Sequence, residues 1–151
     1  MTIQHILVPL DFSAYADQAL EYAMTLAKAL QARLILLHVI HLTPMTMGDM
    51  YGSSVEAYLE AIESEAQKHM DALRNRVQQE GLEGETAIVQ GVPFQLIVDT
   101  AANQDVDLIV MGTHGRTGFT HVLMGSMAER VARLAPCPVL VTRGSTESSS
   151  A

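Results

Sequence analysis

The sequence predicts an α/β fold: a single domain with an open, parallel five-strand sheet and helices on both of its faces. The first observation is an alternation of short aliphatic runs with longer stretches whose apolar residues recur at helical spacing. The second is composition, since 48% of the 151 residues are hydrophobic and 17% are charged, as in an ordered globular chain. In such a sheet a ligand binds at the carboxyl ends of the strands, where the strand order reverses.

The expected elements follow the residue pattern along the chain. Ser13 is a good N-cap for the first helix, and Pro93 stands in the first turn of the third, where a missing N–H matters little. Pro136 and Pro138 end the last helix. The expected strands are residues 3–10, 33–40, 85–90, 107–111 and 139–143, and the expected helices are residues 14–30, 55–79, 93–103 and a fourth beginning near Ser126.

Two segments fall outside this alternation. Residues 41–54 contain Pro44, Gly48 and Gly52, and we interpret them as a mobile loop. The methionines of this loop would either close over an apolar ligand or belong to a merely adaptable surface loop. Residues 1–144 are expected to form the domain, and residues 145–151 a disordered polar tail.

Charge and composition exclude several classes of function. The net charge of −8 argues against general affinity for nucleic acid or acidic lipid. A single cysteine rules out an intrachain disulfide, and no apolar run approaches the roughly 20 residues of a membrane span. The N-terminus lacks the pattern of a signal peptide, so a cytoplasmic protein is expected. The segment of residues 112–143 carries a net positive charge, whereas the rest of the chain is acidic. Its charged residues are Arg116, Arg130, Arg133 and Arg143, with Glu129 as the single acidic residue.

A glycine-rich stretch in this basic segment predicts an anion site. Gly112, Gly115, Gly118 and Gly125 lie between an expected strand and an expected helix. Glycine lets main-chain N–H groups turn toward a ligand, and a helix N-terminus adds unpaired donors and partial positive charge. We therefore expect this stretch to bind phosphates, and Gly125→Val to abolish binding by crowding them while the fold survives.

Two common phosphate sites are excluded by what the sequence lacks. No GxxxxGK[ST] motif is present, which excludes a P-loop NTPase with its phosphate-binding lysine. The first strand-to-helix turn, residues 9–13, has no glycine, which excludes the usual dinucleotide fingerprint at that turn.

The spacing of the glycines resembles a known signature. Gly112, Gly115, Gly125 and Ser126 satisfy the pattern G-x2-G-x9-G-[ST], which is similar to the ATP-binding signature of the universal stress protein family. The resemblance covers nearly the whole chain and includes the segments ILVPLDFS, LILLHV, GVP, DLIVMGTHGRTG and CPVLVTR.

The resemblance implies a fold, a ligand and an assembly. It implies a Rossmann-like sheet in the order 3-2-1-4-5, bound ATP with Mg²⁺ held through the phosphates, and a homodimer formed through residues 139–143. It implies that Pro9, Leu10 and Asp11 lie beside adenine and ribose, and that Val39 meets adenine through its main chain. The residues it places around ribose and phosphates are Met111, Gly112, Thr113, His114, Gly115, Arg116, Thr117, Gly118, Gly125, Ser126, Met127 and Ala128.

Several of these residues allow a second interpretation. Asp11 suits a ribose hydroxyl or a metal-bound water, or else it caps the first helix beside Ser13. His38 lies in an expected core strand, which favours a satisfied buried histidine over a ligand. Cys137, between two prolines, has no neighbour in sequence that would lower its pKa. The histidines without metal-ligand spacing are His5, His41, His69 and His121.

The functional hypothesis is a nucleotide-dependent regulator or sensor of stress. A slow ATPase is the first alternative, although hydrolysis needs a positioned water and charge stabilisation at the γ-phosphate, and no base is evident. No catalytic residue is therefore assigned. The second alternative is a dimeric interaction module that works without nucleotide.

Overall fold

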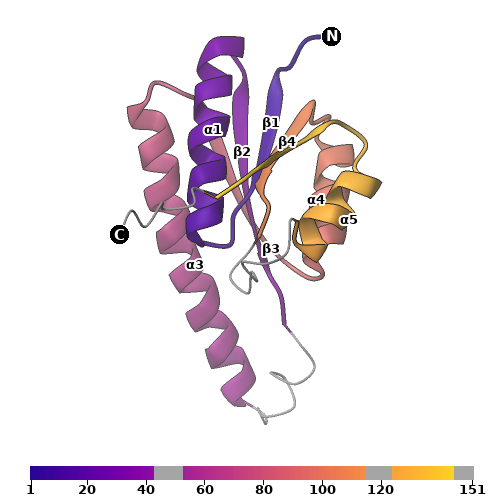
Figure 1. Cartoon of the computed structure of the whole chain (residues 1–151). Coiled ribbons are helices and arrows are strands. Elements are labelled where there is room, and N and C mark those ends of the chain that lie inside the picture. The colour runs from indigo at the N-terminus through magenta and orange to yellow at the C-terminus, as the bar shows by residue number, and fades with distance from the viewer. Residues whose placement is uncertain (43–52, 115–123, 145–151) are drawn as a thin grey trace, which may run out of the picture.

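The computed structural model describes residues 1–42, 53–114 and 124–144, and it contains a parallel five-strand sheet (Figure 1). The strand order is β3-β2-β1-β4-β5, which confirms the expected fold and order. The strands are β1 (His5–Pro9), β2 (Arg33–Ile40), β3 (Gly84–Gln90), β4 (Leu108–Gly112) and β5 (Val139–Thr142), and the helices are α1 (Ala14–Leu30), α3 (Ser53–Gln79), α4 (Pro93–Asn103) and α5 (Ser126–Leu134).

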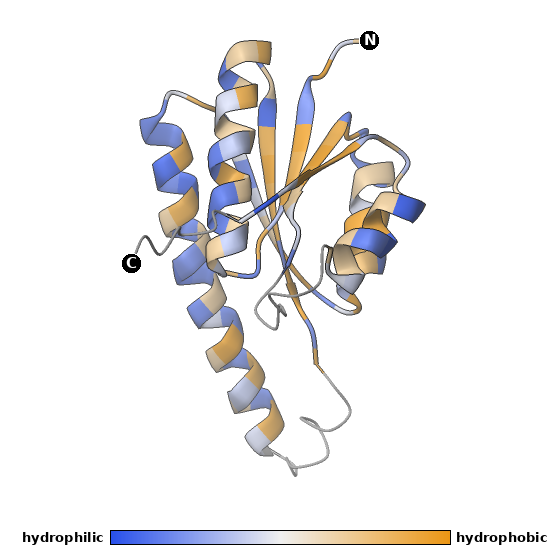
Figure 2. Ribbon diagram, viewed as in Figure 1, coloured by the Kyte–Doolittle hydropathy of each residue, from blue (hydrophilic) through white to orange (hydrophobic). Residues whose placement is uncertain are grey.

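Two hydrophobic layers hold the helices against the sheet. Successive strand residues point to opposite faces, so Ile6 and Val8 pack under α1 and α3, whereas Leu7 packs under α4 and α5. Figure 1 shows the same division, with α1 and α3 on one side of the strands and α4 and α5 on the other. The central strands β1, β2 and β4 are apolar along most of their length (Figure 2), as expected for the middle of a parallel sheet that is buried on both faces, whereas the edge strand β3 begins with polar residues.

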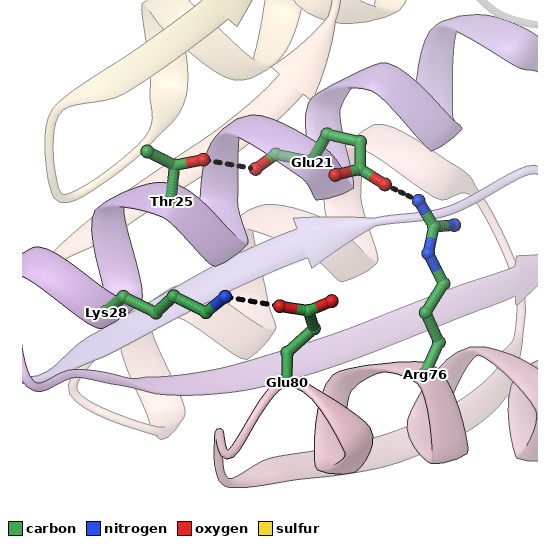
Figure 3. Close-up of polar contacts among 5 residues, drawn as sticks. All are labelled: Glu21, Thr25, Lys28, Arg76 and Glu80. Atoms are coloured by element: carbon green, nitrogen blue, oxygen red, sulfur yellow. Dashed lines mark hydrogen bonds and ion pairs between the residues drawn. The ribbon is translucent and has the colours of Figure 1, made fainter.

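Helix α1 begins and ends as its sequence requires. The Ser13 hydroxyl accepts the Ala16 N–H at 3.2 Å, which confirms Ser13 as the N-cap. The helix ends at Gln31, whose φ of 57° is left-handed. Its outer side meets α3 through two exposed ion pairs, Glu21–Arg76 and Lys28–Glu80 (Figure 3). Exposed pairs of this kind contribute at most about 1 kcal/mol each, so the buried apolar contacts dominate this interface.

Some boundaries differ from the expected ones. β1 begins at His5 rather than at residue 3, because the Asp107 carboxylate takes the N–H groups of Gln4 and His5 at 2.8 and 3.0 Å. Helix α3 begins at Ser53, inside the segment expected to be a loop. The rest of that segment, residues 43–52, and the expected polar tail lie outside the described residues. No helix in the described ranges is long and apolar enough to cross a membrane.

Candidate functional site

The strand order puts the switch point of the sheet between β1 and β4. From β1 the chain continues outward to β2 and β3, and it then returns to the other side of β1 to form β4. The β1–β2 pairing runs on to Pro9↔Leu37, whereas the β1–β4 pairing ends at Leu7↔Ile109. Proline has no N–H to donate to a neighbouring strand, which is consistent with the early end of the pairing with β4. The two strands therefore separate at their carboxyl ends, where ligands bind in open α/β sheets.

The turn from β1 into α1 carries the first group of expected site residues. Leu10 is buried, and its N–H donates to the Leu37 carbonyl at 2.8 Å. The Asp11 carboxylate accepts the Ser13 N–H at 3.0 Å, so it braces the residue that caps α1. This contact supports the structural role considered for Asp11, and it places the carboxylate at the switch point.

Val39 presents its main chain toward β1. Arg33 donates its N–H to Gln4, and Leu37 accepts from Leu10, so the odd-numbered residues of β2 direct their main-chain groups to β1. In a parallel ladder this direction alternates along the strand. The N–H and C=O of Val39 therefore face the side of β1 but lie beyond Pro9, its last residue.

The end of β4 lies against the first turn of α1. A Cβ atom on Gly112 would lie 3.0 Å from Tyr15 Cβ and 3.1 Å from the Tyr15 carbonyl oxygen, so this glycine allows a close approach of β4 to α1. Thr113 is buried, and its hydroxyl lies 3.0 Å from Nδ1 of His114. Met111 is also buried. The next four expected site residues, Gly115, Arg116, Thr117 and Gly118, lie outside the described residues.

The start of α5 returns to the end of β4. Gly125 donates its N–H to the Thr113 carbonyl at 2.6 Å and occupies the N-cap position, where glycine supplies no side-chain oxygen. The first main-chain bond within α5 runs from Glu129 to Gly125 at 3.1 Å. The N–H groups of Ser126, Met127 and Ala128 therefore have no acceptor inside the helix. Unpaired N–H groups and the helix dipole together make such a terminus suited to an anion.

The position of Gly125 changes one expectation. A Cβ atom there would lie 2.8 Å from the Thr113 carbonyl oxygen, closer than real Cβ contacts allow. Gly125→Val would therefore push β4 and α5 apart, and it would not leave the fold untouched while crowding a ligand.

Two arginines of the basic segment, residues 112–143, contact neighbouring side chains. The Arg130 guanidinium lies 4.9 Å from the centre of the Phe94 ring, in cation–π geometry. Arg133 forms an ion pair with Glu129 at 2.7 Å. Both guanidinium groups are therefore engaged by neighbouring side chains, and the main-chain N–H groups at the start of α5 lie closer to the end of β4.

Two other side chains match their expected roles. His38 is half-buried, not fully buried as expected, and its Nδ1 lies 2.6 Å from the Leu10 carbonyl oxygen, which confirms that its ring is hydrogen-bonded. Burial and the nearby Asp107 carboxylate raise the pKa of the Cys137 thiol, which fits the expected inert cysteine. Among the described residues, no three His, Cys, Asp or Glu side chains gather in a group that would hold a metal ion.

Two aromatic residues with no role predicted from the sequence pack at this end of the sheet. Phe12 has a left-handed φ of 65° and stacks between the rings of His38 and His69, at centroid distances of 4.3 and 4.6 Å. Tyr15 packs against Gly112, and its ring lies 5.4 Å from that of His114. The only signal for Phe12 was a large apolar residue in an otherwise polar turn.

The fold and the site define an open, Rossmann-like α/β domain with the N-terminus of a helix, α5, beside the end of β4 at its switch point. A family model described as the universal stress protein family matches residues 2–143, and the chain belongs to this family. Universal stress protein MJ0531 of Methanocaldococcus jannaschii is 35% identical over 138 residues, covering 91% of this chain and 81% of that protein.

Solved structures agree with this assignment. The structure of MJ0577 from the same organism superposes with a TM-score of 0.83 at 31% identity, covering 95% of this chain and 97% of that one. A further universal stress protein, solved in complex with cAMP, is 25% identical with a TM-score of 0.66, covering 96% of this chain and all of that one. A relative with the same fold therefore binds an adenine nucleotide.

Proposed function

We propose that this protein binds ATP at the carboxyl ends of β1, β2 and β4, and that the bound nucleotide makes it a regulator or sensor in a stress response. The observation that carries the proposal is the start of α5, where three main-chain N–H groups without helical acceptors lie beside the end of β4. The adenine nucleotide bound by a relative of the same fold supports it.

The base and ribose belong at the β1–β2 side of the site. Val39 directs an N–H and a C=O past the end of β1, and an adenine edge offers a donor and an acceptor to such a pair of groups. Pro9 and Leu10 bound the same side, and the Asp11 carboxylate is placed to accept from a ribose hydroxyl.

The phosphates belong at the β4–α5 side. Ser126, Met127 and Ala128 donate there through main-chain N–H groups, and Ser126 adds its hydroxyl. The rest of the proposed phosphate and ribose contacts come from Met111, Gly112, Thr113, His114, Gly115, Arg116, Thr117, Gly118 and Gly125.

Magnesium enters this proposal with the nucleotide. Mg²⁺ keeps most of its waters and commonly binds to substrate phosphates plus one or two carboxylates. Asp11 is a carboxylate at the correct end of the sheet, and the ion is otherwise held by phosphate oxygens.

Binding without efficient turnover is the preferred form of the proposal. Hydrolysis needs a positioned base or water together with cationic stabilisation of the γ-phosphate. Among the described residues of α5, Arg130 contacts Phe94 and Arg133 contacts Glu129, so neither supplies that charge.

The bound nucleotide and the ADP release of the purified protein distinguish a nucleotide-binding regulator, a slow ATPase and a nucleotide-independent module. A nucleotide-binding regulator releases intact ATP on denaturation, detected by mass spectrometry, and produces no ADP over many turnovers. A slow ATPase releases ADP continuously with added ATP and Mg²⁺. A nucleotide-independent module carries no nucleotide and takes none up, and that result would refute the proposal.

The proposal includes a homodimer formed through β5. This strand is at the edge of the sheet, with β4 as its neighbour, and Leu140 leaves 38% of its surface exposed. An apolar edge strand readily pairs with a second copy, which buries the exposed side chains and satisfies the edge main chain.

A further inference from the structure

His38 makes a hydrogen bond at the point where the pairing of β1 with β2 ends. Its Nδ1 lies 2.6 Å from the Leu10 carbonyl oxygen, and a carbonyl oxygen only accepts. The ring therefore carries a proton on Nδ1 and donates it to the first residue beyond β1.

The acceptor of this bond is the one that would extend the β1–β2 ladder. Leu10 donates its N–H to Leu37, and in a parallel ladder the next bond would run from the Val39 N–H to the Leu10 carbonyl. Among the described main-chain hydrogen bonds, none joins Val39 to Leu10. The imidazole of His38 donates to this carbonyl at 2.6 Å, and the β1–β2 ladder stops one step before Val39.

The His38 ring also contacts Phe12, the residue that follows Asp11 in the turn from β1 to α1. Phe12 adopts a left-handed backbone with φ of 65°, a conformation that is unfavourable for a non-glycine residue. Its ring stacks on His38 at 4.3 Å and on His69 at 4.6 Å. His38 thus contacts both neighbours of Asp11: the carbonyl before it and the ring after it.

We propose that His38 is a positioning residue for the base and ribose side of the site. By donating to the Leu10 carbonyl, His38 competes with the Val39 N–H for that oxygen and leaves the N–H directed toward a ligand, and by stacking on Phe12 it holds the turn that carries Asp11. This inference rests on the proposed nucleotide function, which did not include His38 among the contact residues.

Two substitutions separate the hydrogen bond from the stacking. His38→Phe keeps a flat ring next to Phe12 but removes the donor. His38→Asn keeps an N–H near the place of Nδ1 but removes the ring. His69→Ala is the matched control, because it removes the other stacking partner of Phe12 and leaves the bond to Leu10.

The first test needs no nucleotide. Amide hydrogen exchange is measured by NMR for Val39 and Leu10 in the free protein and the variants. In His38→Phe the Val39 N–H takes the vacated Leu10 carbonyl, so its exchange slows about tenfold or more, whereas in His38→Asn it stays close to the original rate. The Leu10 amide remains protected if the strands stay paired. If the Leu10 amide loses its protection in His38→Phe, the same measurement is made on His38→Leu. Unchanged Val39 exchange in a variant with paired strands overturns the inference.

The second test measures affinity for ATP and for inorganic tripolyphosphate by calorimetry. His38→Phe weakens ATP binding about fivefold to tenfold, the effect of one lost main-chain contact, and leaves tripolyphosphate binding unchanged. His38→Asn recovers part of the ATP affinity, and His69→Ala changes it less than about twofold. Equal weakening of both ligands, or of neither, contradicts the positioning role. Failure of the unaltered protein to bind ATP refutes the proposed function instead, and the exchange test still decides whether His38 stops the ladder.

Discussion

Replacing Ser126 by aspartate tests the phosphate end of the site, because it has opposite effects on stability and on binding. Ser126 is the first residue of α5, it is exposed, and the N-cap before it is a glycine. A carboxylate in the first turn interacts favourably with the helix dipole, by about 0.3–1 kcal/mol at an exposed site. For a chain of this size we expect Ser126→Asp to raise Tm by about 1–3 °C.

The same carboxylate would repel the phosphates of ATP. At about 5 Å in a water-like dielectric, each pair of unit charges costs about 0.8 kcal/mol, and a triphosphate presents more than one charge. We therefore expect ATP affinity to fall at least about tenfold, with a smaller loss at high salt. Ser126→Asn, of similar size but uncharged, is the control and keeps most of the affinity.

Differential scanning fluorimetry and calorimetry measure the two effects on the same samples. A raised Tm with ATP affinity unchanged would show that the phosphates do not approach α5. A lowered Tm would show that α5 does not begin at Ser126 in solution.

Three further expectations concern other parts of the molecule. Leu140→Asp at the β5 edge should convert a dimer into monomers in sedimentation equilibrium with an unchanged circular dichroism spectrum, and a variant that still dimerises would place the interface elsewhere. Asp107→Asn should lower the free energy of unfolding by about 1 kcal/mol at pH 7, because hydrogen bonds from Gln4 and His5 lower the pKa of this partly exposed carboxyl. The difference should shrink as the pH falls below about 3.9 and vanish below the folded-state pKa, and a difference that persists in acid would contradict this cause. Burial raises the pKa of Cys137, so the rate of alkylation by iodoacetamide should be lower in the folded protein than in urea. The rate should also begin to increase at a higher pH than the rate of an exposed thiol. Equal rates in the folded protein and in urea would refute the raised pKa.

Much of the fold was predictable because apolar periodicity marks buried elements. The bounds of α1, β2 and α4 match the expected ranges, and Ser13 caps α1 as expected. The strand order came from the family resemblance, since alternation alone is compatible with several orders. The start of β1 was misplaced, because the Asp107 carboxylate reaches it from a residue about one hundred positions away, beyond any local pattern.

The site was less predictable in its contacts than in its location. Gly112 and Gly125 were expected to serve a ligand, but they also have packing roles: the Thr113 carbonyl leaves no room for a Cβ atom at Gly125, and Tyr15 approaches Gly112 closely. Such contacts depend on how elements pack, which the local sequence does not encode. The left-handed Phe12 was missed for the same reason, since its stacking partners come from β2 and α3.

Titration of nucleotide-free protein with ATP and Mg²⁺ by calorimetry tests the central claim most directly. We expect saturable binding of one ATP per chain, weakened in Ser126→Asp and largely retained in Ser126→Asn. The absence of saturable heat, or equal binding by both variants, would contradict a nucleotide site at the start of α5.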